Sequence, residues 1–363
     1  MKNRIVAVDI FRGMTIVMMI LVNNPGTWAA VYAPFLHADW HGYTPTDLVF
    51  PFFLFIVGTS IAFAYQNKTT TANTYKKITV RSLKLIGLGL FLGAFTITFP
   101  FFKEFSSIRF PGVLQRIGVV FFISAILFIN FKWKTLISIT IFILVGYWLA
   151  MGFIPVEGVA PTFERAPNNL ANYIDLKVLG NHMWKKDYDP EGFLSTIPAV
   201  ASCLLGIFTG LILNSKQEKK ATILMGIGGT LLLIGHLWDL IFPINKALWS
   251  SSFVLVTAGW SNLILALIYY CTDIKKIKFG TAFKYAGANA IAVFFLSSFI
   301  AKLFGLIKVD ADGTSIHSWL FNTIYVYEGI SLQASSLFYA LSVTSFYLGV
   351  AYFLYKRQIF IKV

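Results

Sequence analysis

The sequence predicts an all-α fold, a polytopic membrane helix bundle with about ten transmembrane helices that forms one domain over residues 1–363. Hydrophobic residues make up 57% of the chain, and its mean hydropathy is +0.71. Charged residues make up only 13%, whereas an average soluble domain carries about a quarter. The apolar residues stand in long runs, which is the pattern of helices that cross a bilayer.

Ten apolar runs have about the length of 20 residues that a helix needs to cross the hydrocarbon core. The expected spans are residues 5–24, 46–65, 81–100, 112–130, 135–154, 194–213, 221–242, 249–271, 286–305 and 334–355. The first run follows basic residues, as in a signal peptide, but Asp9 and Arg12 interrupt it and no small-residue cleavage site follows. We therefore expect it to be the first span.

Basic residues are distributed unevenly between the segments that join these spans. In a soluble protein a net charge of +14 would suggest nucleic-acid binding. Here, however, 19 Lys and Arg residues fall on one side of the predicted bundle and 8 on the other. The positive-inside rule then predicts cytoplasmic termini, lipid surroundings and no nucleic-acid partner. The long connectors 25–45, 155–193 and 306–333 face outside, and because of their length we expect the site there.

Several kinds of chemistry receive no support from the sequence. Cys203 and Cys271 lie in apolar runs and give neither a disulfide framework nor a metal-binding spacing. The chain has no Gly-rich phosphate loop, no zinc spacing and no Gly-x-Ser-x-Gly motif. Composition and spacing alone therefore indicate a membrane enzyme or a transporter with a site on its outer face.

His37 is the strongest candidate for acid–base chemistry. It lies in the connector 25–45, which is rich in aromatic residues and contains no Lys or Arg. An imidazole can accept a proton near neutral pH, and Asp39 is close enough in sequence to orient it. A single loop histidine is more often an ordinary surface residue, and His41 is a second candidate with weaker support.

Asp47 has two interpretations. The sequence Thr44-Pro45-Thr46-Asp47 is typical of a helix start, with Thr44 as the N-cap, Pro45 at the first helical position and Asp47 at the third. Capping alone would explain the carboxylate, but it would also lie at the outer interface near His37. Both roles are open, and Asp189-Pro190-Glu191 repeats the pattern before the sixth span.

Charged side chains inside spans are costly and need a partner or a function. Asp9 and Arg12 are three residues apart on one helical face, and we expect a mutual ion pair. Arg116 lies inside the fourth predicted span, two turns after Arg109. Three partners fit Arg116 equally well, namely a phosphate of a nucleotide ligand, Asp9 or Asp239.

Six segments resemble, in order, the heparan-α-glucosaminide N-acetyltransferase family of transmembrane acyltransferases, including its bacterial members. They are VDIFRGMTIVMMILVNNPG (8–26), LHADWHGYTPTDLVFPFFLFIVGTSIA (36–62), RFPGVLQRIGVVFF (109–122), YDPEGFLSTI (188–197), INKALWSSSFVL (244–255) and GANAI (287–291). The HADW…TDLVFPFF stretch together with RFPGVLQR is the most specific part. The lysosomal member has an additional N-terminal domain and span.

This resemblance implies transfer of the acetyl group of acetyl-CoA to the amine of a terminal glucosamine, without a metal, in a bacterial inner membrane. It places the family's active-site histidine at His37 and its asparagine at Asn23, and it includes Asp47 in the matched TDLVFP. His37 would act as base or carry the acetyl group itself, and Asn23 would hydrogen-bond the thioester carbonyl. The expected cofactor-binding residues are Arg116 and Arg109, which would hold the CoA phosphates, and Gln115 and Trp40.

One departure from the family concerns the acceptor. Ser297 stands where the lysosomal member has a further histidine, so a role of that histidine cannot be carried over. Two alternative functions stay open, an amino-sugar transporter without acyl transfer and an acyltransferase that acts on another cell-envelope glycan. The oligomeric state is also open, with a homodimer among the states considered.

Overall fold

The computed structural model describes residues 5–66 and 70–361 and confirms the all-α class. Within these residues it contains thirteen α-helices and no strand. Four of the basic residues counted for the topology, Lys2, Arg4, Lys68 and Lys362, lie outside the described residues.

Eight helices of the described chain are long and apolar enough to cross a membrane. They are α1 (Val6–Asn23), α2 (Pro45–Tyr65), α4 (Val113–Asn130), α5 (Trp133–Phe153), α7 (Thr196–Asn214), α8 (Lys220–Asp239), α9 (Ser251–Tyr269, continued by the π-helical turn η3, Tyr270–Ile274) and α13 (Leu332–Lys356). The expected span 81–100 differs from the structure, because helix α3 (Ala72–Ala94) ends earlier and is not among the helices apolar enough to cross a membrane. Helix α3 also begins earlier because the polar, Lys-containing stretch before residue 81 is also helical, with Thr71 as its N-cap.

The expected span 286–305 is a bent pair of helices. Helix α10 (Thr281–Ala288) and helix α11 (Ala290–Leu306) meet at an angle of 82°, so the count of apolar crossings is nine if the pair is one span. Asn289 occupies the break and ties it to the C-terminal segment, because its Nδ2 donates to Ile359 O at 2.9 Å and its Oδ1 accepts from Ile361 N at 2.9 Å.

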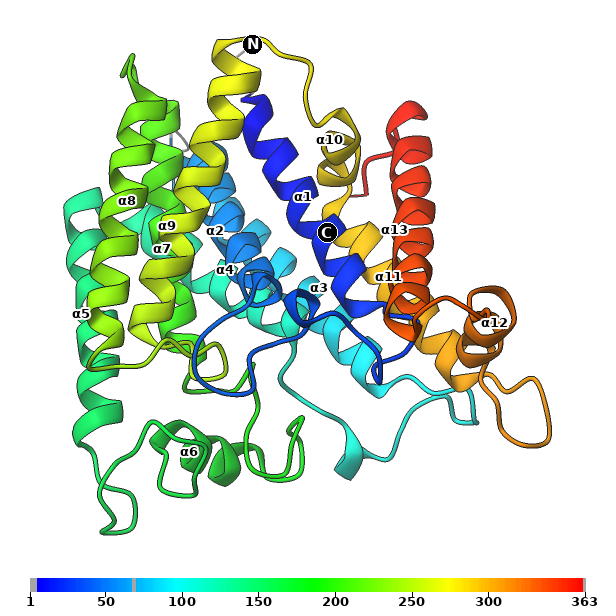
Figure 1. The fold of residues 1–363 in the computed structure, drawn as a ribbon. Coiled ribbons are helices and arrows are strands. Elements are labelled where there is room, and N and C mark those ends of the chain that lie inside the picture. The colour runs from blue at the N-terminus through cyan, green and yellow to red at the C-terminus, as the bar shows by residue number, and fades with distance from the viewer. Residues whose placement is uncertain (1–4, 67–69, 362–363) are drawn as a thin grey trace.

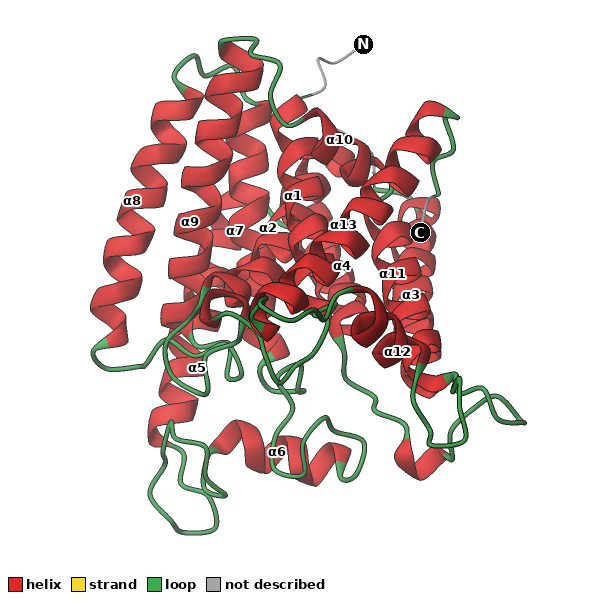
Figure 2. Cartoon of the chain, turned by 45° about the vertical axis from the view of Figure 1, so that its right-hand side comes forward, coloured by secondary structure: helices red, strands yellow, loops and turns green. Residues whose placement is uncertain are grey.

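The two ends of the bundle differ in character (Figure 1). One end holds the beginning of α1 and the short turns between helices, and α13 runs up to that same end. The opposite end holds the long connectors with the short helices η1 (Ala33–Phe35), η2 (Phe105–Ser107), α6 (Leu170–Leu179) and α12 (Ile316–Ile324). Figure 2 shows the same separation from a second side. The three long connectors therefore share one face, and its outward orientation stays a prediction.

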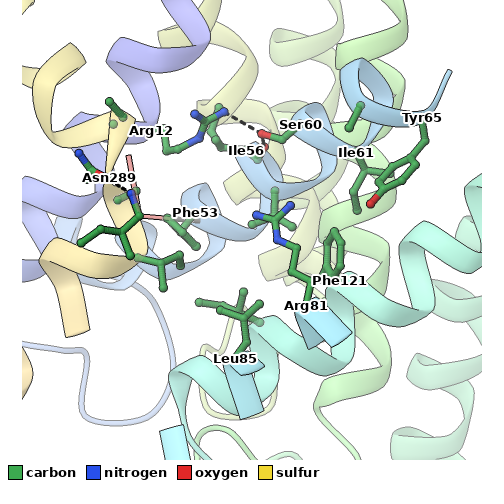
Figure 3. A pocket seen from close by; sticks show the side chains of 18 residues that line it. Arg12, Phe53, Ile56, Ser60, Ile61, Tyr65, Arg81, Leu85, Phe121 and Asn289 are labelled. Carbon is green, nitrogen blue, oxygen red and sulfur yellow. Dashed lines mark hydrogen bonds between the residues drawn. The ribbon is translucent and has the colours of Figure 1, made fainter. Parts of the chain in front are cut away.

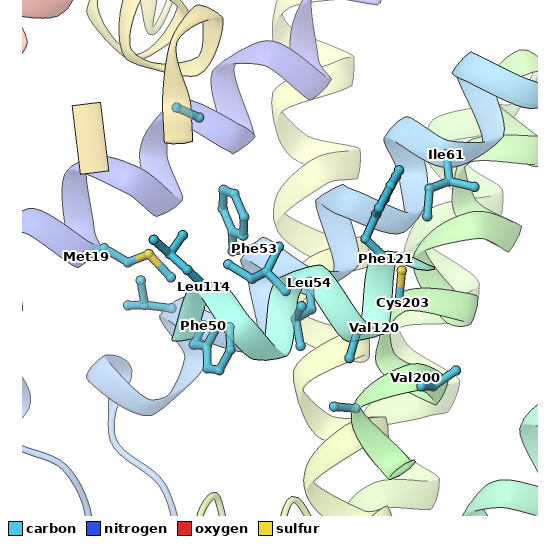
Figure 4. Close-up of a cluster of buried hydrophobic side chains, with 14 of the residues drawn as sticks. Met19, Phe50, Phe53, Leu54, Ile61, Leu114, Val120, Phe121, Val200 and Cys203 are labelled. Carbon is cyan, nitrogen blue, oxygen red and sulfur yellow. The ribbon is translucent and has the colours of Figure 1, made fainter. Parts of the chain in front are cut away.

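Helix α2 packs closely against α7 in the centre of the bundle. A Cβ atom on Gly206 would lie 1.9 Å from the carbonyl oxygen of Phe55, and one on Gly58 would lie 1.9 Å from that of Cys203. Small residues of this kind allow helix backbones in a membrane to approach each other. Apolar side chains fill the centre around α2, with Phe53 gathered beside Met19 of α1 and Leu114 of α4 (Figure 4). This packing fixes α2, which carries Asp47 in its first turn.

Candidate active site

A cavity of about 650 Å³ lies at the end of the bundle that holds the long connectors. We call it the His37 cavity. Its walls come from α1, α2, α4 and α11 and from the connectors before α2 and α7. Five of the seven predicted site residues line it, namely His37, Asp47, Asn23, Trp40 and Arg109.

His37 and Asp47 form the polar centre of this cavity. Nδ1 of His37 lies 2.7 Å from Oδ1 of Asp47. The imidazole side chain is 51% exposed, whereas the carboxylate side chain is 1% exposed. A neutral imidazole that donates from Nδ1 to the carboxylate keeps its lone pair on Nε2, and Nε2 is then the atom that can accept a proton. Of the two acids considered for orienting His37, the structure places Asp47 against it, while Asp39 lines the same cavity.

The second oxygen of Asp47 caps helix α2. Oδ2 accepts the backbone N–H of Thr44 at 2.9 Å and that of Ala38 at 3.0 Å. Thr44 is the N-cap and Pro45 the first helical residue, which confirms the predicted helix start. The structure confirms the capping interpretation of Asp47 and its position against His37, and its role in catalysis stays a prediction.

Lys246 is a site residue that the sequence interpretation missed. Its Nζ lies 3.0 Å from Nδ1 and 3.3 Å from Nε2 of His37, and 3.4 Å from Oδ1 of Asp47. The side chain is 17% exposed. Burial lowers the pKa of Lys246, and the negative charges of Asp47 and Glu191 act in the opposite direction.

The backbone brings Lys246 to His37 from 209 positions away in the sequence. Gly42 N donates to Ile244 O at 2.7 Å, which joins the connector of His37 to the connector between α8 and α9. The sequence offers one weak signal, a single Lys in a short predicted outer connector within the INKALWSSSFVL segment. Nothing in the sequence pairs that connector with residues 25–45.

Arg109 is held by two carboxylates of the connector before α7. Its Nε donates to Asp189 at 2.8 Å and its Nη2 to Glu191 at 2.5 Å, while its guanidinium lies 5.1 Å from the ring centre of Trp184. Burial acts against the charge, but the hydrogen bond to Asp189 and the charge of Glu191 outweigh it and raise the pKa of Arg109.

The predicted capping role of Asp189 is wrong, because α7 begins at Thr196 with Ser195 as its N-cap. Residues 190–195 stay outside the helix while the Asp189 carboxylate binds Arg109 and the backbone N–H groups of Trp184 and Glu191.

Arg116 and Gln115 lie outside the His37 cavity and line a separate, mostly apolar cavity of about 430 Å³. Arg116 is 2% exposed, and its Nη2 donates to Ser195 Oγ at 2.5 Å and to Gly192 O at 3.1 Å. The guanidinium lies 5.0 Å from the ring centre of Trp249. The cofactor-binding role expected for Arg116 and Gln115 stays a prediction.

The two carboxylates considered as partners of Arg116 are engaged elsewhere. Asp9 pairs with Arg12 at 3.2 Å, which confirms the predicted ion pair, and Asp239 accepts the backbone N–H of Ile244 at 2.6 Å.

A third cavity, of about 380 Å³, is lined by residues of α1, α2, α3, α4, α10 and α11 (Figure 3). We call it the Arg12 cavity. Arg12 and Arg81 bring two guanidinium groups to its lining, together with Ser60 and Tyr65. Arg12 Nη2 donates to Ser60 Oγ at 2.8 Å.

The His37 cavity and the Arg12 cavity are both lined by helices α1, α2, α4 and α11. On three of them, residues that line the two cavities are three or four positions apart, namely Phe50 and Phe53, Val113 and Ile117, and Ile291 and Phe294. Three to four residues make about one helical turn, roughly 5 Å. On these three helices the apolar partition between the cavities is about one turn thick, and on α1 the lining residues Arg12 and Met19 are seven positions apart.

The described residues contain no group of three or more His, Cys, Asp or Glu that could hold a metal ion. Apolar helices of spanning length around a cavity with a His–Asp contact define a multi-pass membrane protein. The catalytic family "Heparan-alpha-glucosaminide N-acetyltransferase" matches residues 4–242, which include all seven predicted site residues, and the chain belongs to this family.

Two relatives carry the name heparan-alpha-glucosaminide N-acetyltransferase. The Mus musculus protein is 31% identical over 425 residues, covering 99% of this chain and 61% of that protein. The Homo sapiens protein is 30% identical over 423 residues, covering 99% of this chain and 60% of that protein. The chain therefore spans about three fifths of the length of these curated relatives, and the family resemblance of the sequence is confirmed.

Proposed function

We propose that the protein transfers the acetyl group of acetyl-CoA to the amine of a glucosamine-type sugar, with His37 as base or acetyl carrier. The observation that carries the proposal is the contact of 2.7 Å between His37 and Asp47 in a cavity of about 650 Å³, inside the region matched by the family. The reaction would take place in a bacterial inner membrane with both termini in the cytoplasm, as the charge distribution predicts.

His37 has the chemistry that an amine acceptor requires. A protonated amine has no lone pair, so a base near neutral pH must take its proton before it can attack a thioester. Nε2 of His37 would take that proton while Asp47 holds Nδ1. The amine nitrogen then bonds the acyl carbon, and the carbon–sulfur bond breaks to release CoA thiol. Alternatively, Nε2 itself takes the acetyl group first and passes it to the amine. Asn23, which lines the cavity, would donate to the carbonyl oxygen.

The Arg12 cavity suits the anionic end of the donor. Arg12 and Arg81 offer guanidinium groups, which bind phosphates through paired N–H donors. Arg116 and Gln115 line a different cavity, and Arg109 is held by two carboxylates. In this proposal Arg81 takes over the phosphate-binding role together with Arg12, which has one carboxylate partner, Asp9, and lines the same cavity. The acetyl end would reach the His37 cavity through the thin apolar partition.

The lining of the His37 cavity suits an amino-sugar or glycan acceptor. Trp28, Trp40 and Trp184 offer flat aromatic faces, and Asp39 and Glu191 offer negative charge to an ammonium group. A cavity at the connector end is also open to an acceptor that arrives from outside.

The test is acetyl transfer by purified protein in detergent, with radiolabelled acetyl-CoA and glucosamine. We expect label on the sugar with the wild-type protein and none with His37→Ala. His236→Ala is the matched control, because His236 lies on α8 and does not line the cavity. Among the described residues its ring hydrogen-bonds the Leu232 carbonyl and makes an edge-on contact with the ring of Tyr43.

Three outcomes would change the proposal. Normal turnover by His37→Ala would remove the catalytic assignment. Binding of amino sugars without any transfer would favour the transporter. Transfer only to an isolated cell-envelope glycan would favour the other acceptor class.

A further inference from the structure

Lys246 is the charged residue against His37 that the proposed chemistry leaves unused. We propose that Lys246 is a catalytic residue whose ammonium group stabilises the negative charge that develops on the carbonyl oxygen of the acetyl group during attack by the acceptor amine. The inference rests on the proposed acetyl transfer and adds to it the group that supplies positive charge at the reacting carbonyl.

The position of Lys246 puts its charge within reach of that oxygen. To take the acceptor's proton, Nε2 of His37 must come within about 3 Å of the acceptor nitrogen. This nitrogen bonds the acyl carbon, so the carbonyl oxygen is only two bonds away from it. Nζ of Lys246 lies 3.3 Å from Nε2. An ammonium group has three N–H donors; Asp47 at 3.4 Å and the His37 ring at 3.0–3.3 Å engage two of them, so the third can reach the carbonyl oxygen.

The ammonium is held in place before any substrate arrives. Asn245 Oδ1 accepts the backbone N–H of Leu248 at 2.9 Å, and Asn245 N donates to Ser250 Oγ at 3.0 Å. The neighbouring Ile244 is tied to the His37 connector through Gly42. A fixed charge stabilises a developing oxyanion most effectively, because no reorganisation is needed during the reaction.

No other cation of the described cavity lining is equally free to do this. Arg109, the other basic residue of that lining, is bound by Asp189 and Glu191. Arg116 is buried behind the cavity wall and bound to Ser195.

The charged and titratable groups around Lys246 set the pH range in which it keeps its charge. They are Asp47 on α2, His37 and Asp39 on the first connector, Glu191 before α7, and Arg109 and Arg116 near the start of α4. Burial lowers the pKa of Lys246 below that of an ordinary lysine, although Asp47 and Glu191 oppose the shift. If transfer needs the ammonium, activity must fall as Lys246 loses its proton at alkaline pH.

A purely structural role makes a different prediction. If Lys246 only neutralised the buried Asp47 carboxylate, the alkaline limb of the activity would not depend on whether position 246 carries an amine or a guanidinium.

The experiment measures kcat and KM for acetyl transfer to glucosamine across neutral and alkaline pH with wild type, Lys246→Met and Lys246→Arg. The control is Lys308→Met, which removes an exposed lysine outside both cavities. Loss of one oxyanion-stabilising donor typically lowers kcat by about 10²- to 10³-fold. We expect a loss of that size for Lys246→Met with little change in KM for the sugar. Lys246→Arg should keep part of the activity, and its alkaline limb should move to higher pH.

The outcomes separate this inference from the proposed function. If wild type transfers acetyl and His37→Ala does not, while Lys246→Met keeps wild-type kcat, the role of Lys246 is overturned and the proposed function stands. If Lys246→Met does not fold, the Lys246→Arg profile decides, and an alkaline limb identical to that of wild type overturns the inference. Absence of transfer by the wild-type protein overturns both.

Discussion

At the scale of single residues, Asp47 joins the stability of the protein to its chemistry. Oδ2 completes the start of α2 through the N–H groups of Thr44 and Ala38, and Oδ1 faces His37 and Lys246. A carboxylate has acceptor sites on both oxygens, so one side chain can serve both sets of partners. Changes at this position should therefore affect folding and catalysis together.

The substitution Asp47→Asn should lower both thermal stability and transfer rate. An amide offers an oxygen to only one of the two sets of partners, so either the cap or the orientation of His37 is lost. Losing an N-terminal cap costs about 1 kcal/mol. The measurement is melting temperature and kcat on the same detergent preparation.

Thr71→Ala is the control for this prediction. Thr71 caps α3 by accepting from Thr74 N at 3.3 Å, and it lines neither cavity. Its loss should lower the melting temperature and leave kcat unchanged. A fall in the rate of Asp47→Asn with an unchanged melting temperature would contradict the capping contribution.

His37 and Asp47 could be predicted because local sequence carries their signal, an imidazole in a connector without Lys or Arg and a Thr-Pro-x-Asp helix start. Lys246 could not, because its connector meets that of His37 only in the folded chain. Ser297, which replaces a family histidine, is buried and donates to Phe294 O at 2.8 Å, and Phe294 itself lines the His37 cavity. That neighbourhood depends on contacts that form only in the folded chain.

At the scale of helices, the close approach of α2 and α7 supports the site. Gly206 of α7 faces the backbone of Phe55 on α2, and Gly210 one turn later faces Thr59 and Ala62. The Asp47 end of α2 is therefore positioned by contacts deep in the bundle as well as by its cap.

The substitution Gly206→Ala should lower both stability and activity. The new Cβ would lie 1.9 Å from the carbonyl oxygen of Phe55, so the two helices must move apart. Overpacking of this kind typically costs about 1–3 kcal/mol, and a displaced α2 would shift Asp47 relative to His37. The checks are thermal unfolding in detergent and the transfer assay.

Gly146→Ala on α5 is the matched control, since nothing lies within 4 Å of the added Cβ. It should be neutral or slightly stabilising, because alanine favours a helix over glycine. Equal behaviour of the two variants would contradict the packing argument.

The helices themselves were largely predictable, because apolar runs of spanning length mark them directly. Two details were not. The Lys-containing first half of α3 lacks the apolar signal although it is helical, and the bend at Asn289 depends on hydrogen bonds to residues 359 and 361, about 70 positions later.

At the scale of the whole molecule, the two ends of the helix bundle hold different kinds of connecting segment. The long connectors gather at one end, and the start of α1 and the end of α13 lie at the other (Figure 1). The segments at the end of the bundle where α1 begins carry the excess of basic residues, which predicts that this end faces the cytoplasm.

A topology reporter fused after Val363 should therefore read cytoplasmic, and one inserted in the exposed turn at Gly158 should read external. The measurement is the activity of a reporter that works on one side of the membrane only. Insertion at Gly313, in another long connector, is a second external control. An external signal from the C-terminal fusion would overturn the assignment of the two faces.

The thin partition between the cavities also bears on the electric field in the membrane. If water from each side of the membrane fills the cavity at that side, most of the transmembrane voltage drops across about one helical turn near Phe50 and Phe53. A unit charge that crosses there does work of about 2.3 kcal/mol per 100 mV. In the proposed reaction the acetyl group is neutral, so its passage would require no electrical work, whereas the apolar turn would be a barrier to protons and other ions.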